Sequence, residues 1–400
     1  MDLSLSSEYE AFREQVRQFL EQHKGSAPSQ HDLILKSRKR MAWQQLLLEQ
    51  GYIARTIPKQ YGGFGEAPDI LKARIITEEF ERAGVPVRVR IANRQGVNML
   101  VPTLLEFGTE EQKRRWIPPT LRGELIWCQG YSEPNAGSDL ASLQTKAVID
   151  DGHYVINGQK IWTSEAHQAD MIFCLVRTET DAPEHKGISF LIFPMDLPGI
   201  EVRPLKTMTG TSSFNEVFFT DVRVPTDQIV QQPGNGWRVA NATLTHERGT
   251  LGGADVACGR IRRIIDMMHQ ETVAGERLID NAVFRDQLIR LQARVQAMKL
   301  HGLRLLTYEL KNEDPGLVQL VVKMQGCELS HQLASLAINI MGELGVLYED
   351  SPYLRDGGQW QYDYMFDLGL IIGGGTAQVQ KNIIAERGLG MPREPALAKI

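Results

Sequence analysis

The sequence predicts an α+β protein with three parts: an N-terminal α-helical domain over 1–125, a middle β-barrel or sandwich domain over 126–236, and a C-terminal four-helix bundle over 237–400. Two changes of hydrophobic period carry this prediction. Apolar residues recur at helical spacing before residue 126, follow strand patterns up to about 236, and then return to helical spacing. Strands and helices do not alternate, which argues against a Rossmann nucleotide site.

The N-terminal part begins with an amphipathic pattern, because Phe12, Val16, Phe19 and Leu20 share one helical face. Further helical stretches are expected at 43–48, 70–83 and 110–116.

The middle part contains two dipeptides, Asp151-Gly152 and Asn157-Gly158, that are typical of two-residue hairpin turns. Runs rich in β-branched and aromatic residues flank them and continue along the chain. Strands are expected around 147–149, 153–156, 159–162, 171–176, 188–193, 200–203 and 217–224. Short strands at this spacing are typical of a small barrel or sandwich.

The C-terminal part returns to the helical period after the turn at 233–236. Long helices are expected near 237–271, 281–312, 316–347 and 376–388. Four long helices favour a four-helix bundle.

The composition limits the classes of function. A net charge of -5 without a basic stripe argues against a nucleic-acid partner. No apolar run reaches the roughly 18 residues of a membrane span, and Met1–Ser4 does not begin a signal peptide, so a cytoplasmic protein is expected. The four cysteines show no CxxC spacing and the nine histidines form no close cluster, so no metal site is expected.

Three short motifs carry the chemistry: Ser-Glu-Pro-Asn-Ala-Gly-Ser-Asp at 132–139, Asn-Gly-Gln-Lys-Ile-Trp-Thr-Ser at 157–164, and Gly-Thr-x-x-x-Gln at 375–380. Taken singly, the first is also typical of a polar interdomain loop and the second of a strand whose tryptophan packs inward. Their order and spacing together resemble the acyl-CoA dehydrogenase family along nearly the whole chain.

The resemblance implies that FAD binds between the middle and C-terminal domains and is completed by a neighbouring subunit. The hydroxyls of Ser132 and Ser164 would hydrogen-bond the isoalloxazine, and Trp162 would flank it. Ser138 would also face the CoA arm, and Arg248 would bear on the same thioester ligand. The remaining FAD contacts that the resemblance implies are Gln129, Tyr131, Gly137, Ser138, Asn339, Gly342, Thr376 and Gln378.

The implied reaction is α,β-dehydrogenation of an acyl-CoA to the trans-2-enoyl-CoA, for which a carboxylate removes the α-proton. The backbone N–H of Gly374 would polarise the thioester carbonyl, but glycine supplies no carboxylate at a position where a close relative carries the base. Glu247, directly before Arg248, matches the branch that includes isovaleryl-CoA dehydrogenase and is the expected base. His246 is the alternative, but it points about 100° away from Glu247 on a helix.

Some positions depart from the family pattern. Glu271 and Ala274 stand where many members carry the arginine and phenylalanine of a motif that meets the FAD pyrophosphate of the adjoining subunit. Asn339 and Glu343 replace two positions of another motif. A carboxylate at 271 would repel a pyrophosphate. The chain is therefore expected to form either a homotetramer that holds FAD differently or a heterotetramer with a related subunit.

Three functions follow from this resemblance. The first is a dehydrogenase that passes electrons to an electron-transfer flavoprotein. The second is an acyl-CoA oxidase or related flavin oxygenase that uses molecular oxygen. The third is a subunit whose main task is to stabilise a catalytic partner.

Overall fold

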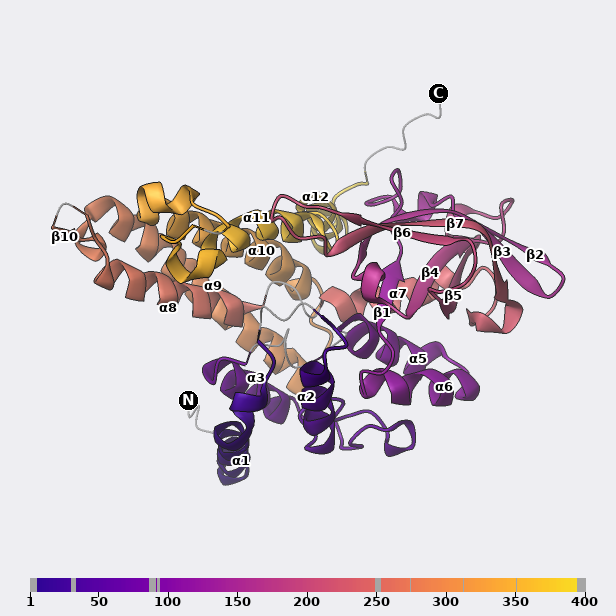
Figure 1. The fold of residues 1–400 in the computed structure, drawn as a ribbon, viewed down its shortest axis with the longest axis horizontal. Helices are drawn as coiled ribbons and strands as arrows, with labels where there is room; N and C mark the ends of the chain where they lie inside the picture. The colour runs from indigo at the N-terminus through magenta and orange to yellow at the C-terminus, as the bar shows by residue number, and fades with distance from the viewer. Residues whose placement is uncertain are drawn as a thin grey trace. The chain divides into compact units, whose positions relative to one another are not determined.

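The computed structural model describes residues 6–29, 34–85, 91, 94–248, 253–273, 275–311, 313–349 and 351–393, without the side chains of Glu247, Arg248 and Glu309. The chain forms two compact units, Met1–His246 and Glu247–Ile400, called the first and second unit below. The described residues comprise N-terminal helices, a middle β-sheet and C-terminal helices (Figure 1), as the sequence predicts.

The N-terminal part of the first unit is helical, with α1 Ser7–His23, α2 Arg38–Glu49, α3 Ile70–Arg82, α5 Val101–Phe107 and α6 Glu110–Leu121. The expected apolar face of α1 is buried. Thr109 and Gln112 form a reciprocal capping box that starts α6. Trp116 of α6 packs edge-on against Trp127, with ring centroids 5.8 Å apart, so helices and sheet share one hydrophobic core.

The middle of the first unit is an eight-stranded sheet with the order β6-β7-β3-β2-β4-β5-β8 and β1 beside β4. Its strands are β1 Trp127–Gly130, β2 Lys146–Asp150, β3 His153–Ser164, β4 Met171–Arg177, β5 Ile188–Pro194, β6 Ile200–Leu205, β7 Phe214–Pro225 and β8 Ile229–Val230. Phe193 of β5 and Phe219 of β7 lie 5.8 Å apart although three strands separate β5 from β7 in the sheet order. The sheet therefore curls around a core of its own.

The prediction of a turn at Asn157-Gly158 is wrong, because both residues lie inside the continuous strand β3. The Asn157 side chain exchanges two hydrogen bonds of 2.9 Å with Asp221 on β7. A Cβ on Gly158 would lie 2.7 Å from the Cα of Thr145, and the pairing with β7 shifts register here. The dipeptide thus forms a bulge that needs a glycine for close strand approach.

Helix α7, Gly236–Arg248, continues from the first unit into the second. The second unit then contains α8 Ala254–Gln270, α9 Ala282–Leu310, α10 Val318–Met341, α11 Gln359–Ile372 and α12 Ala377–Ile383, with a small hairpin of β9 Thr272–Val273 and β10 Glu276–Arg277. α10 packs against α8, α9 and α11. A helical bundle is confirmed, but its four long helices are α8 to α11.

The structure departs from the helix predictions in this region at three places. The stretch 237–271 is divided between α7 and α8, with Gly253 preceding α8. No prediction covers helix α11. The predicted helix at 376–388 is present as the short α12 followed by a π-helical turn at Ile384–Gly388.

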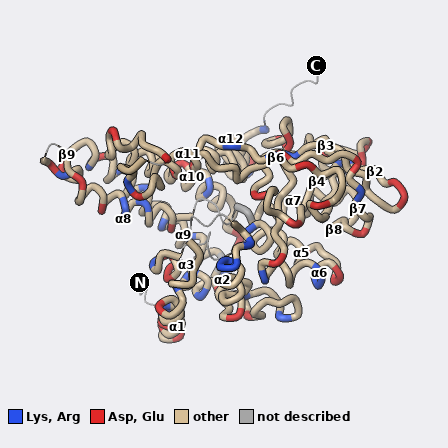
Figure 2. Tube along the Cα trace, viewed as in Figure 1, with Lys and Arg blue, Asp and Glu red and all other residues tan. Residues whose placement is uncertain are grey.

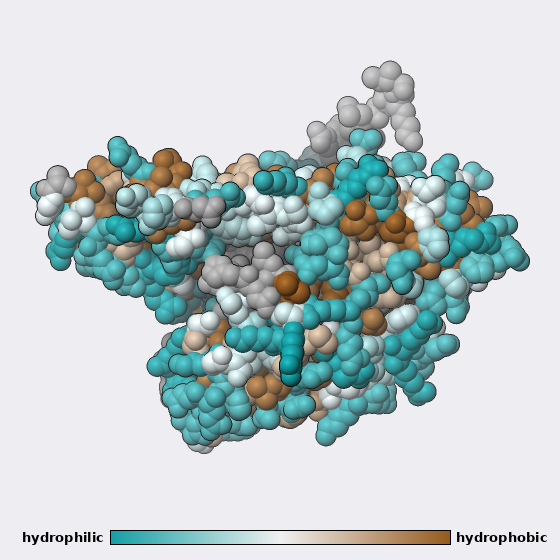
Figure 3. Space-filling model, in the orientation of Figure 1, coloured by the Kyte–Doolittle hydropathy of each residue, from teal (hydrophilic) through white to brown (hydrophobic). Residues whose placement is uncertain are grey.

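Charged residues of both signs are interspersed along the described parts of both units (Figure 2). On the face shown in Figure 3, apolar residues form small groups between polar ones. None of the described helices combines the length and the apolar character needed to cross a bilayer.

Candidate active site

The first unit brings Ser132, Trp162 and Ser164 to the neighbouring ends of two chain segments. Ser132 follows β1, and its carbonyl accepts a 2.9 Å hydrogen bond from the N–H of Ile161 in β3. Trp162 and Ser164 complete β3. Both serines are half-buried, and neither hydroxyl bonds another residue in the described part of the chain. Two hydroxyls able to donate or accept are therefore available to a ligand.

Trp162 has an unusual backbone and an exposed ring. Its φ is 60°, in the left-handed region that a bulky residue rarely adopts, and the register with β7 shifts between Lys160 and Thr163. The side chain is 58% exposed, and its ring meets Phe214 edge-on at 6.0 Å. A bulge that re-aims a large aromatic side chain outward fits a residue that flanks a planar ligand.

A buried ion pair holds these segments together. The ammonium of Lys160, which is fully buried, lies 2.7 Å from Oε1 of Glu133 and donates at 3.1 Å to the carbonyl of Tyr131. Glu133 also accepts hydrogen bonds from the N–H groups of Gln144 and Thr145, at 2.6 and 2.9 Å. The residues on both sides of Ser132 are thus tied to the strand that carries Trp162.

The charge of Glu133 depends on these partners. Burial by itself would raise the pKa of this carboxyl. The adjacent Lys160 ammonium and the hydrogen bonds to the carboxylate outweigh burial and hold the pKa below 4.5. Glu133 is therefore ionised at neutral pH and acts as a structural anion within the site.

The other predicted residues of the first unit occupy different environments. Gln129 is half-buried in β1, whereas Gly137 and Ser138 are exposed in the turn that follows Glu133. The Tyr131 side chain is 5% exposed, and its ring packs edge-on against Phe173 at 6.0 Å. The ring belongs to the core, so Tyr131 contacts the candidate site through its carbonyl, which accepts from Lys160.

In the second unit, the predicted carbonyl donor lies in the loop between α11 and α12. Gly374 and Gly375 have φ values of 65° and 92°, which favour glycine. The N–H of Gly374 bonds no other group among the described residues. Thr376 caps α12 by accepting from the N–H of Val379 at 3.2 Å, and Gln378 is exposed. The loop therefore presents a main-chain donor without a carboxylate.

The positions that depart from the family pattern lie elsewhere in the second unit. Asn339 is exposed near the end of α10, and its carbonyl accepts the N–H of Gly342, whose φ is 57°. Glu271 follows α8 and pairs with Arg355, with Nε and Oε1 3.0 Å apart. This arginine offsets the negative charge that the sequence places at position 271. Ala274 lies outside the described residues.

Glu247 and Arg248 occupy the last two positions of α7, and their side chains lie outside the described residues. The preceding turn is firmly held, because the buried hydroxyls of Thr103 in α5 and Thr243 in α7 lie 3.0 Å apart. Burial lowers the pKa of the half-buried His246, although the nearby Glu106 opposes that shift.

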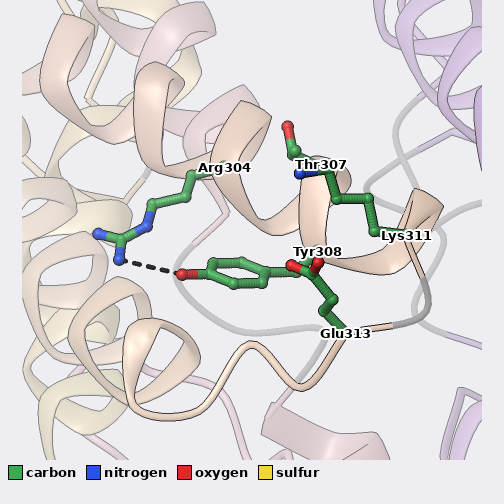
Figure 4. A pocket seen from close by; sticks show the side chains of 5 residues that line it. All are labelled: Arg304, Thr307, Tyr308, Lys311 and Glu313. Atoms are coloured by element: carbon green, nitrogen blue, oxygen red, sulfur yellow. Dashed lines mark hydrogen bonds between the residues drawn. The ribbon is translucent and has the colours of Figure 1, made fainter.

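Two of the hollows on the described surface are large enough to hold a small ligand. One, of about 410 Å³, is lined by Arg304, Thr307, Tyr308, Lys311 and Glu313 near the end of α9 (Figure 4), where Arg304 donates to the Tyr308 hydroxyl at 3.2 Å. The other, of about 490 Å³, adjoins β2 and β4. Neither contains a predicted site residue.

Sequence reasoning missed Glu133, Lys160, Lys323 and Gln380 as supports of the site. Glu133, Lys160 and Gln380 lie inside the three motifs, and Lys323 interrupts the apolar run at 320–324. A lysine inside an otherwise buried segment is the available signal, because a buried ammonium needs acceptors.

Comparison with known proteins identifies the family of the chain. Models of the N-terminal, middle and C-terminal domains of acyl-CoA dehydrogenases match residues 6–124, 128–222 and 234–389. The acyl-CoA dehydrogenase IpdE1 of Mycobacterium tuberculosis is 38% identical, covering 96% of this chain and 98% of the relative. IpdE1 of Mycolicibacterium smegmatis is 37% identical, covering 97% and 99%.

Two solved structures are similar over nearly their whole length. A structure described as the Tcur3481-Tcur3483 steroid ACAD is 31% identical with a TM-score of 0.82, covering 98% of this chain and 100% of that one. The ChsE4-ChsE5 complex from Mycobacterium tuberculosis is 32% identical with a TM-score of 0.83, at the same coverage. With all three domains matched, the chain belongs to the acyl-CoA dehydrogenase family, which is FAD-dependent, and is an oxidoreductase of that kind.

Proposed function

We propose that this enzyme converts an acyl-CoA to its trans-2-enoyl-CoA with Glu247 as the base. The main support is the strained, exposed Trp162, which lies on the same strand as Ser164 and next to Ile161, whose N–H bonds the carbonyl of Ser132. An aromatic plane with donors and acceptors beside it fits an isoalloxazine ring. FAD, when bound, accepts the hydride from the β-carbon.

The chain's own residues would handle the proton and the carbonyl. The N–H of Gly374 donates to the thioester oxygen, which stabilises the negative charge that develops when the α-proton leaves. Glu247 takes that proton, because position 374 carries no carboxylate. The Thr103–Thr243 contact supports this role by fixing the turn of α7 just before the proposed base.

For the substrate, we propose a bulky, polycyclic acyl-CoA such as a steroid-derived thioester. The similarity to a protein described as a steroid ACAD supports this class. The proposed electron acceptor is an electron-transfer flavoprotein. Flavin bleaching by a panel of straight, branched, aromatic and steroidal CoA esters identifies the substrate, and stoichiometric peroxide formation would instead identify an oxidase.

For the assembly, we propose a heterotetramer with a related subunit. The similarity to the ChsE4-ChsE5 complex supports this, as do the departures at Glu271, Asn339 and Glu343. The test is to express the chain alone and measure FAD per protomer and molecular mass. A colourless product that does not form the oligomer agrees with the proposal, whereas a yellow homotetramer contradicts it.

The role of Glu247 is tested with Glu247→Gln in the FAD-loaded enzyme or complex. We expect FAD and acyl-CoA binding to persist while flavin bleaching slows by at least about a thousandfold, because the essential proton acceptor is removed. Glu184→Gln, at an exposed position in the first unit, is the control and should bleach normally. Retained bleaching in Glu247→Gln would refute the assignment.

A further inference from the structure

A buried lysine touches the loop that carries the proposed carbonyl donor. Lys323 of α10 is 1% exposed, and its ammonium donates to the carbonyl of Gly375 at 2.6 Å. The same ammonium lies 3.4 Å from the carbonyl of Ile371, in the last turn of α11. One cation therefore bonds both the end of α11 and the last glycine of the loop.

The electrostatics of these contacts are favourable. The C-terminal carbonyls of a helix carry partial negative charge, so a cation placed there interacts favourably with the helix end. A charge-assisted bond is stronger than a neutral one, and a buried ammonium without acceptors would be costly. Lys323 is thus bound to these carbonyls more firmly than a neutral side chain would be.

Besides the N–H of Gly373, which bonds the carbonyl of Gly369 at 2.8 Å, few contacts from the described residues restrain the loop. Glycine has the greatest backbone freedom of any residue, and three consecutive glycines span 373–375. The amide of Gln380 approaches the carbonyls of Gly374 and Gly375 only at 3.4 and 3.5 Å. Together with its contact to Ile371, the bond from Lys323 therefore restrains the peptide planes of residues 371–372 and 375–376, on either side of Gly374.

We propose that Lys323 is a positioning residue, which holds the 373–375 loop so that the Gly374 N–H points at the thioester oxygen. The inference rests on the proposed role of Gly374. Lys323 itself touches neither substrate nor cofactor in this account. Its effect is to align the main-chain donor before the substrate arrives.

The first test is hydrogen exchange of the FAD-loaded enzyme or complex, comparing Lys323→Met with Leu333→Ala. Leu333 is fully buried in the same helix, and its truncation destabilises the bundle by ~2–5 kcal/mol through a cavity. We expect the segment 372–380 to exchange at least about tenfold faster in Lys323→Met than in Leu333→Ala. Equal exchange in the two variants would overturn the proposal.

The second test measures the acidity of the α-carbon of bound acetoacetyl-CoA, from enolate absorbance against pH. A donor aligned with the thioester oxygen stabilises the enolate. Wild type should lower the pKa of the bound ligand below that of the free ligand. In Lys323→Met the pKa of the bound ligand should be about one unit higher than in the wild type, a tenfold change in the enolate equilibrium. Leu333→Ala should leave this pKa unchanged. Lys323→Arg, which keeps a charged donor, should recover part of the effect.

The outcomes separate the two claims. If the wild type does not lower the pKa of bound acetoacetyl-CoA, Gly374 is not the carbonyl donor. Hydrogen exchange would still decide whether Lys323 holds the loop. If the wild type and Lys323→Met lower this pKa equally, the role of Lys323 is refuted and the proposed reaction is unaffected.

Discussion

Replacing Lys160 by methionine should destabilise the segments proposed to bind FAD in the first unit by more than the lost packing of the side chain would. The substitution leaves the Glu133 carboxylate buried, with two main-chain N–H groups but no cation. It also removes the donor that the Tyr131 carbonyl accepts. Removing one partner of a buried ion pair costs ~3–5 kcal/mol.

Hydrogen exchange measures this loss of stability segment by segment. A loss of ~3 kcal/mol or more corresponds to roughly a hundredfold faster exchange, at 1.36 kcal/mol per factor of ten. The affected segments should be 128–136 and 158–164, which the ion pair joins. FAD retention should fall with them, because Ser132 and Trp162 lie on these segments.

Two further variants isolate the charge effect. Adding Glu133→Gln to Lys160→Met removes the stranded anion and should recover part of the loss. Lys146→Met, at an exposed lysine of β2, should exchange like the wild type. The reasoning fails if Lys160→Met and Lys146→Met exchange alike, or if the double variant is no better than Lys160→Met alone.

Two other substitutions test the first unit. Burial raises the pKa of Glu165 from 4.5 to about 7, although the charge of Arg40 opposes the shift. Ionisation of this carboxyl therefore destabilises the folded state increasingly as pH rises from 4.5 to about 7, by at most ~3 kcal/mol. Glu165→Gln should therefore raise the thermal midpoint at pH 8 but not at pH 4, and an equal rise at both values would contradict this. Gly158→Ala should destabilise by ~1–3 kcal/mol more than Gly152→Ala in thermal denaturation, because a Cβ at 158 meets Thr145 at 2.6 Å whereas 152 has open space. Equal losses would show that the close strand approach is unimportant.

The sequence predicts the order of helices and strands because burial follows simple periods. It fails for α11, where the buried face carries Asp363 and Asp367 and the outward face carries Tyr364 and Leu368. Arg260 of α8 pairs with both carboxylates inside the bundle. A hydrophobic pattern cannot reveal a helix whose polar side is buried against a charge on another helix.

Site prediction has a similar limit. The motifs predict roles for Ser132, Trp162 and Ser164, and Gly374 directly precedes the third motif. The left-handed backbone of Trp162 is not visible in the sequence, because it arises from the mismatch of β3 and β7. The contact of Lys323 with Gly375 joins residues 52 positions apart, so only the folded chain reveals it.

The lysine under the glycine loop bears on how active sites of this kind change over evolution. Lys323 bonds main-chain oxygens of Ile371 and Gly375, and such oxygens are present whatever side chain a position carries. An acidic residue at position 374 would have to adopt the left-handed backbone that now favours glycine, but the contacts of Lys323 with the main chain would not depend on its side chain. The proton-accepting side chain would then be free to migrate to another helix while the carbonyl-polarising amide stays in place.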